Sequence, residues 1–250
     1  MLPLVHTTQA GFGRDAVDDG HLRASDCKAL PGVPRLYFFF GKPAYRSKDD
    51  YEASDHLGHF PFVFVADPDT IEPPMHVFPF DTGAALNGRF DIAADRTVMF
   101  EDYELWPTFQ SARQMVGWAF ETVDDYLSGD LRSNLSADIP SHHMATKSFL
   151  KVAQLARSTH NDRETYDGRA SAIEVCLGRN VSIANSVDLV IVPDALLDVG
   201  LETENSDFLN RLEALEVPWK TYHWSPYMRP ADFHADIEAI VKSHLKTFIS

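Results

Sequence analysis

Apolar residues in this chain occur in two kinds of pattern: short continuous runs and longer stretches with helical spacing. Short runs bounded by Gly, Pro or Asp are typical of buried β-strands. The clearest of these runs are Arg35–Phe40, Pro61–Ala66 and Val187–Val192. Weaker runs predict further strands at Leu2–Val5, His76–Phe80, Ala170–Leu177 and Trp219–His223.

Helical spacing of apolar residues predicts helices at Ser111–Leu127, Thr146–Arg157, Ser206–Leu215 and Pro230–Phe248. The polar, glycine-containing stretch Gly11–Gly20 predicts a short helix or a turn. Strands and helices follow one another irregularly, without regular βαβ alternation. This order indicates an α+β fold with a mainly antiparallel central sheet flanked by helices. A chain of 250 residues fits one large domain or two small ones, and we expect residues 1–250 to form a single domain.

The stretch Arg35–Arg46, RLYFFFGKPAYR, is the most informative part of the pattern. Its aromatic run ends abruptly at Gly41 and Pro43. Gly41 allows a close backbone approach that a side chain would block, and Pro43 restricts the residue before it. The strand would therefore deliver Lys42, Tyr45 and Arg46 to its end, where binding groups are often placed. An ordinary core strand followed by a solvated turn is the alternative.

A second informative stretch is Asp167–Val175, DGRASAIEV, which sets Glu174 among apolar neighbours. A carboxylate in such a setting is usually paired, protonated or functional, because burying an unpaired charge is expensive. Alternatively, Glu174 faces solvent from a half-exposed strand. Near the N-terminus, His6 and Thr7 follow a short apolar run, and a His at that position can bind a ligand or fulfil a structural role. In the turn Phe80–Gly83, Asp81 is better suited to capping a helix than to binding a substrate.

Composition narrows the possible functions. The residues are 44% hydrophobic and 24% charged, as in ordinary globular proteins, and the net charge is −15. This charge argues against non-specific coating of nucleic acid. Two cysteines are too few for a disulfide framework, and His142 and His143 lack the spacing of a zinc site, so we expect no metal. We find neither a leader pattern nor an apolar run of membrane-spanning length, and we expect a cytoplasmic protein without membrane association.

Three short motifs together resemble the ADP-ribosyltransferase superfamily. They are VHTT at Val5–Thr8, the aromatic strand ending in FGKPAYR, and RASAIEV at Arg169–Val175. Within the superfamily, they are most similar to the DarT-type DNA base ADP-ribosyltransferases, although the spacing within FGKPAYR differs. The RNA 2′-phosphotransferases are more distant relatives. The resemblance covers Leu4–Arg46 and Arg169–Val175, and it implies an ADP-ribosyltransferase-like fold with NAD as the substrate.

The resemblance also implies roles for individual residues. Glu174 would stabilise the oxocarbenium character that the ribose gains when the bond to nicotinamide breaks. Arg46 would bind the pyrophosphate or steady the glutamate. The remaining residues expected at the NAD site are His6 and Thr7 at the adenosine-side ribose, Tyr37 or Tyr45 stacked on nicotinamide, and Gly41 at the strand end.

The resulting hypothesis is an NAD-dependent ADP-ribosyltransferase that modifies a nucleic acid or protein acceptor and releases nicotinamide. A protein with this activity would act as a bacterial toxin or an antiphage defence enzyme. A non-catalytic nucleotide-binding or interaction module of the same fold is the main alternative. An RNA 2′-phosphotransferase is a weaker alternative, because we do not find the basic residues that its phosphate requires.

Overall fold

The computed structural model describes residues 1–26, 32–44, 52–91, 94–155, 168–198 and 203–249. The chain divides into two compact units, and each is described by itself. The first comprises Met1–Asp26, Pro34–Glu72 and Gly178–Ser250, and the second comprises Cys27–Val33 and Pro73–Leu177. In both units helices accompany strands that pair mainly in antiparallel fashion, so the predicted α+β class is confirmed.

The first unit is built on a sheet with the strand order β3-β1-β4-β8-β9, in which only the β8–β9 pair of the described strands is parallel. The strands of this unit are β1 (Leu4–Gln9), β2 (His21–Leu22), β3 (Leu36–Phe40), β4 (Pro61–Ala66), β7 (Val181–Ser182), β8 (Val187–Pro193) and β9 (Trp219–Tyr222). The α-helices are α1 (Ala10–Asp19), α7 (Ile183–Ser186), α8 (Thr203–Ala214) and α9 (His234–Ile249). Short 3-10 helices lie at Leu57–His59, Pro68–Thr70, Asp194–Leu197 and Pro230–Phe233.

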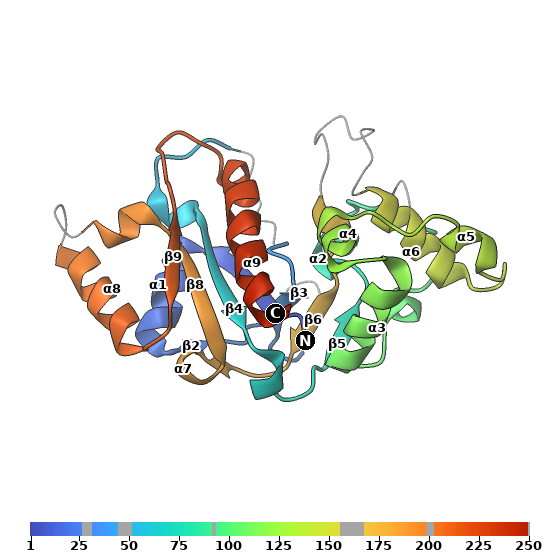
Figure 1. The fold of residues 1–250 in the computed structure, drawn as a ribbon, viewed down its shortest axis with the longest axis horizontal. Helices are drawn as coiled ribbons and strands as arrows, with labels where there is room; N and C mark the ends of the chain where they lie inside the picture. Colours follow the sequence, from blue (N-terminus) through green and yellow to red (C-terminus); the bar gives the residue numbers. More distant parts are fainter. Residues whose placement is uncertain (27–31, 45–51, 92–93, 156–167, 199–202, 250) are drawn as a thin grey trace. The chain divides into compact units, whose positions relative to one another are not determined.

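Helices cover both faces of this sheet. In Figure 1, α9 crosses in front of the strands and α1 lies behind them. On the α1 side, the ring of Phe62 contacts those of Phe64 and Phe208, with centroids 4.9 and 6.2 Å apart. On the α9 side, Phe233 packs against Tyr222 at 5.2 Å between ring centroids. The aromatic residues of the sequence therefore form a core on either side of the sheet.

The second unit contains one strand pair, β5 (His76–Phe78) with β6 (Glu174–Leu177), and several helices (Figure 1). The α-helices are α2 (Thr82–Leu86), α3 (Phe109–Ala119), α4 (Val123–Ser128), α5 (Leu135–Asp138) and α6 (Met144–Gln154). Short 3-10 helices lie at Phe100–Tyr103 and Gly168–Ser171.

Two predicted elements of the second unit were wrong in extent. The single helix expected at Ser111–Leu127 is interrupted, because α3 ends at Ala119 and Thr122 begins α4. Thr122 and Asp125 form a capping box, in which each side chain accepts a hydrogen bond from the other residue's backbone N–H. The strand expected from Ala170 begins only at Glu174, since the residues before it form a 3-10 turn.

Candidate active site

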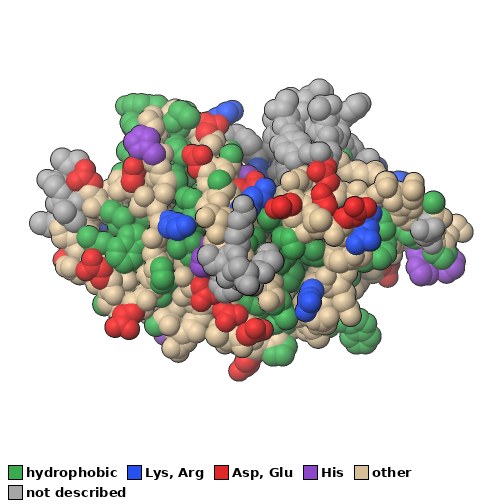
Figure 2. All heavy atoms as spheres, viewed as in Figure 1, with side chains coloured by type: hydrophobic (Ala, Val, Ile, Leu, Met, Phe, Trp, Pro, Cys, Tyr) green, Lys and Arg blue, Asp and Glu red, His purple; other side chains and the backbone are tan. Residues whose placement is uncertain are grey.

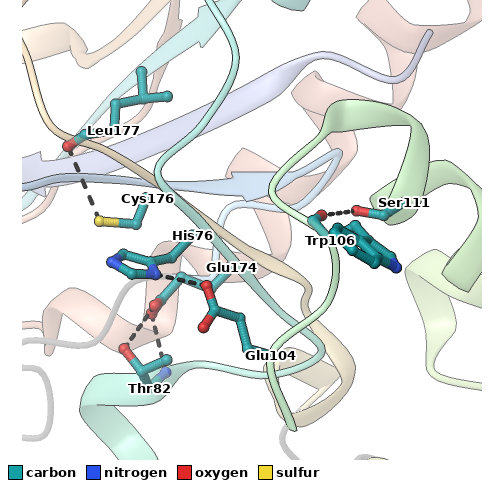
Figure 3. Close-up of polar contacts among 8 residues, drawn as sticks. All are labelled: His76, Thr82, Glu104, Trp106, Ser111, Glu174, Cys176 and Leu177. Atoms are coloured by element: carbon teal, nitrogen blue, oxygen red, sulfur yellow. Dashed lines mark hydrogen bonds and ion pairs between the residues drawn. The ribbon is translucent and has the colours of Figure 1, made fainter. Parts of the chain in front are cut away.

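Glu174 is the first residue of β6 and lies opposite Phe78 of β5. Only 3% of its surface is exposed, so the solvent-facing alternative is wrong. Both carboxylate oxygens accept hydrogen bonds from one residue: Thr82 N donates to Oε2 at 3.0 Å, and Thr82 Oγ1 donates to Oε1 at 2.6 Å (Figure 3). Two donors on one rigid residue fix both the position and the orientation of this buried carboxylate.

The segment just before Glu174 is held by a buried tyrosine. Tyr126 of α4 is fully buried, and its hydroxyl accepts a hydrogen bond from Ile173 N at 3.2 Å. Burial raises the pKa of Tyr126 well above its usual value, so the hydroxyl stays protonated. The 3-10 turn therefore passes into β6 at a fixed point, which places Glu174 at the start of the strand.

Thr82 was missed as a site residue, whereas the predicted role of Asp81 is confirmed. The Asp81 side chain accepts a hydrogen bond from Ala84 N at 2.9 Å and caps α2. That cap orients the first turn of α2 and hence the backbone N–H of Thr82. The sequence signal for this arrangement is the Asp81-Thr82-Gly83 turn after β5, but nothing local links it to Glu174.

His6 lies on β1 in the first unit, at the point where β1 and β3 stop pairing. The β1–β3 register consists of Leu4↔Phe40 and Val5↔Phe39. Beyond it, His6 Nδ1 donates a hydrogen bond to the carbonyl of Tyr37 at 2.8 Å. A carbonyl only accepts, so Nδ1 carries the proton, and in the neutral ring Nε2 is an acceptor.

Burial keeps this imidazole neutral, and contacts with two aromatic rings hold it in place. Desolvation by burial lowers the pKa of His6, which outweighs the opposing effect of its bond to Tyr37. The ring contacts Phe38 and Phe64, with centroids 5.6 and 6.2 Å apart. His6 therefore presents a fixed acceptor nitrogen, and within the described part of the chain no group hydrogen-bonds to it.

Thr7 and Gly41, two other predicted site residues of the first unit, lie in surroundings different from those of His6. Thr7 is 8% exposed, and alternation along β1 directs its side chain to the sheet face opposite His6. Among the described residues, none hydrogen-bonds to its Oγ1. Gly41 has a φ of 69°, which a residue with a side chain rarely adopts, and its N–H donates to Pro3 O at 2.8 Å. It therefore ends β3 with a sharp, fixed turn.

The structure thus places the predicted residues in two groups. His6, Thr7, Tyr37 and Gly41 belong to the first unit, and Glu174 belongs to the second. Tyr45 and Arg46 lie outside the described residues. That the two groups converge on one NAD site stays a prediction.

Within the described ranges, no group of three His, Cys, Asp or Glu side chains is arranged to hold a metal ion. No helix among them has the length and apolar character needed to cross a membrane.

The chain matches no protein-family model and no curated protein sequence. Among solved structures, it is similar to the DarT of Thermus sp. 2.9 in complex with carba-NAD+. The two share 11% sequence identity with a TM-score of 0.38, over 89% of this chain and 95% of that one.

Proposed function

We propose that this protein is an NAD-dependent ADP-ribosyltransferase that transfers ADP-ribose to a macromolecular acceptor and releases nicotinamide. The observation that carries the proposal is the buried carboxylate of Glu174, held at both oxygens by Thr82. This glutamate belongs to the motif RASAIEV, on which the resemblance to ADP-ribosyltransferases rests.

The proposed chemistry follows from the charge that develops on the substrate. When the bond between nicotinamide and ribose breaks, positive charge spreads over the ribose C1 and its ring oxygen. A fixed negative charge in a dry environment stabilises this state more than it stabilises neutral ground-state ribose. Glu174 would supply that charge without reorganising, because its orientation is already set by Thr82.

The first unit would hold the remainder of NAD. His6 Nε2 is suited to accept a hydrogen bond from a hydroxyl of the adenosine-side ribose. Gly41 would let the backbone approach the cofactor closely at the end of β3. The remaining proposed contacts are Thr7 at the same ribose, Tyr37 or Tyr45 on the nicotinamide ring, and Arg46 at the pyrophosphate.

In this proposal the acceptor is a nucleic acid or a protein. The enzyme would act in the cytoplasm as a bacterial toxin or a defence enzyme. A second candidate function is a module that binds NAD without cleaving it. The observation in its favour is that Thr82 occupies both oxygens of Glu174, as it would in a carboxylate with a purely structural role.

The test measures NAD consumption and nicotinamide release by chromatography, with binding followed separately by calorimetry. We expect the wild type to release nicotinamide and Glu174→Gln to bind NAD but lose about a hundredfold or more in rate, the scale of removing one electrostatic stabiliser. Glu121→Gln is the matched control, because Glu121 is exposed and lies in the same unit.

The outcomes separate the two candidates. Binding without nicotinamide release by the wild type would establish the non-catalytic module. A Glu174→Gln variant as active as Glu121→Gln would show that Glu174 is not catalytic. No binding and no release by the wild type would refute both candidates.

A further inference from the structure

Two adjoining hollows open on the surface of the second unit, and neither is lined by a residue assigned to NAD. Their volumes are 430 and 540 Å³, and they share a wall of Glu104, Leu105, Met115 and Trp118. Each hollow is too large for a single side chain and has the size of a small-molecule or peptide site. Together they form what we call the Trp106 groove, after the tryptophan that lines the larger hollow but not the smaller one.

Trp106 is exposed to an unusual degree for a tryptophan, at 83% of its surface. Its backbone is nevertheless fixed. The carbonyl of Trp106 accepts hydrogen bonds from Thr108 N at 2.7 Å and from Ser111 Oγ, and the preceding residue, Leu105, donates to Val77 O at 2.9 Å. In Figure 3, the indole points away from the strands that carry His76 and Glu174.

A rigid loop that presents a large aromatic side chain to solvent is typical of a binding anchor, because little entropy is lost when it is covered. Trp118 and Met115 add further apolar surface to the same wall. Tryptophan and methionine are both over-represented where one protein binds another.

The charges around the groove are of one sign. Among the described residues that line it, the acidic ones are Glu101, Asp102 and Glu104, the histidine is His143, and none is Lys or Arg. Glu104 pairs with His76 at 2.6 Å, whereas no described group pairs with the Glu101 carboxylate. Figure 2 shows both acidic and basic side chains on the visible face, with the acidic ones more frequent, in keeping with the net charge of −15.

We propose that the Trp106 groove binds a short peptide segment of a partner protein that carries Lys or Arg next to apolar residues. The cationic group would lie on the indole face of Trp106, within reach of Glu101, and the apolar residues would cover Met115 and Trp118. No residue assigned to NAD lines this groove, so the proposal does not depend on the proposed activity.

The test is an array of short immobilised peptides of random sequence, probed with the intact protein. We expect the bound peptides to be enriched in Lys and Arg and depleted in Asp and Glu. For the best binder, labelled and followed by fluorescence anisotropy, Trp106→Ala should weaken binding about tenfold or more, as for an anchor residue. Glu101→Gln should weaken it about threefold, and added salt should remove that difference.

Matched controls come from the first unit. Tyr227→Ala removes another exposed aromatic side chain, at 73% exposure, and Glu213→Gln removes another exposed carboxylate. Neither should change binding, and circular dichroism of all variants should match that of the wild type. The proposal is overturned if no peptide binds, if the binders are not basic, or if Trp106→Ala binds like Tyr227→Ala. It is also overturned if a single-stranded oligonucleotide, rather than a peptide, binds in a Trp106-dependent way.

Discussion

The hydrogen bond between Thr82 Oγ1 and Glu174 Oε1 offers a direct measure of how strongly the site holds its carboxylate. At 2.6 Å it is short, and both residues are buried, at 2% and 3% exposure. Thr82→Val keeps the shape of the side chain, removes the hydroxyl and leaves the backbone donor in place. A hydrogen bond to a charged group contributes about 1.5–3 kcal/mol, so the free energy of unfolding should fall by about that amount.

A double-mutant cycle isolates this contribution from other effects of the substitutions. The four proteins are the wild type, Thr82→Val, Glu174→Leu and the double variant, unfolded in urea at neutral pH; Leu is used because, unlike Gln, it cannot accept a hydrogen bond from Thr82. Tryptophan fluorescence is a suitable signal, because Trp106 and Trp118 both belong to the second unit. The coupling energy between the two positions should be about 1.5–3 kcal/mol.

Thr82→Ser is the matched control, since it keeps the hydroxyl and loses only a methyl group. It should retain most of the stability and most of the nicotinamide release. A coupling energy within about 0.5 kcal/mol of zero, the limit for independent sites, would refute the assignment of Thr82 as the residue that holds Glu174.

Two further predictions concern the first unit. A Cβ at Gly13 of α1 would lie 2.2 Å from the Phe62 ring, so Gly13→Ala should destabilise the protein by about 1–3 kcal/mol in urea unfolding, and an equal or higher stability would contradict this packing. Gly11→Ala is its control, because the nearest atom to a Cβ there is 3.8 Å away. Burial lowers the pKa of His6 in the folded protein below the ordinary value of 6.5. As the pH falls below 6.5, the unfolded chain therefore binds a proton at His6 before the folded protein does, and the free energy of unfolding decreases. His6→Asn, which can still donate to Tyr37 O, should therefore lose less stability than the wild type between neutral and acidic pH, and parallel stability curves would show that His6 is not buried as described.

Much of the strand framework could be predicted from the sequence because buried strands have a simple signal. The run Pro61–Ala66 coincides with β4, and Val187–Val192 lies within β8. The continuous apolar pattern at Ala170–Leu177 was less informative, because a buried 3-10 turn and a buried strand have the same composition. Burial was predicted correctly there, but backbone conformation was not.

The sequence does contain a pattern that marks the break between α3 and α4, but the helical spacing of apolar residues continues across it. Thr122 followed three residues later by Asp125 is a capping-box pattern, which predicts the start of a new helix. The apolar residues on both sides nevertheless kept their helical spacing. Spacing alone therefore predicted one helix where the capping residues indicate two.

The candidate site shows the same division between local and long-range information. The buried setting of Glu174 follows from its neighbours in the sequence, but its partner Thr82 lies 92 positions away. Residues so far apart are brought together by the pairing of β5 with β6, which one sequence does not specify. Similarly, the sequence marks His6 at a strand end, whereas its protonation on Nδ1 depends on the carbonyl of Tyr37.

Glu174 in the second unit and His6 in the first unit are both hydrogen-bond acceptors. Glu174 acts as an acceptor at both of its oxygens, each of which takes a hydrogen bond from Thr82. His6 has its only proton committed to Tyr37 O, which leaves Nε2 as an acceptor. Both residues therefore favour a ligand that offers hydroxyl donors over one that offers only acceptors, such as a bare phosphate. Each ribose of NAD offers such hydroxyls, so the preference supports a site for the sugars of NAD and argues against a site for a phosphate alone.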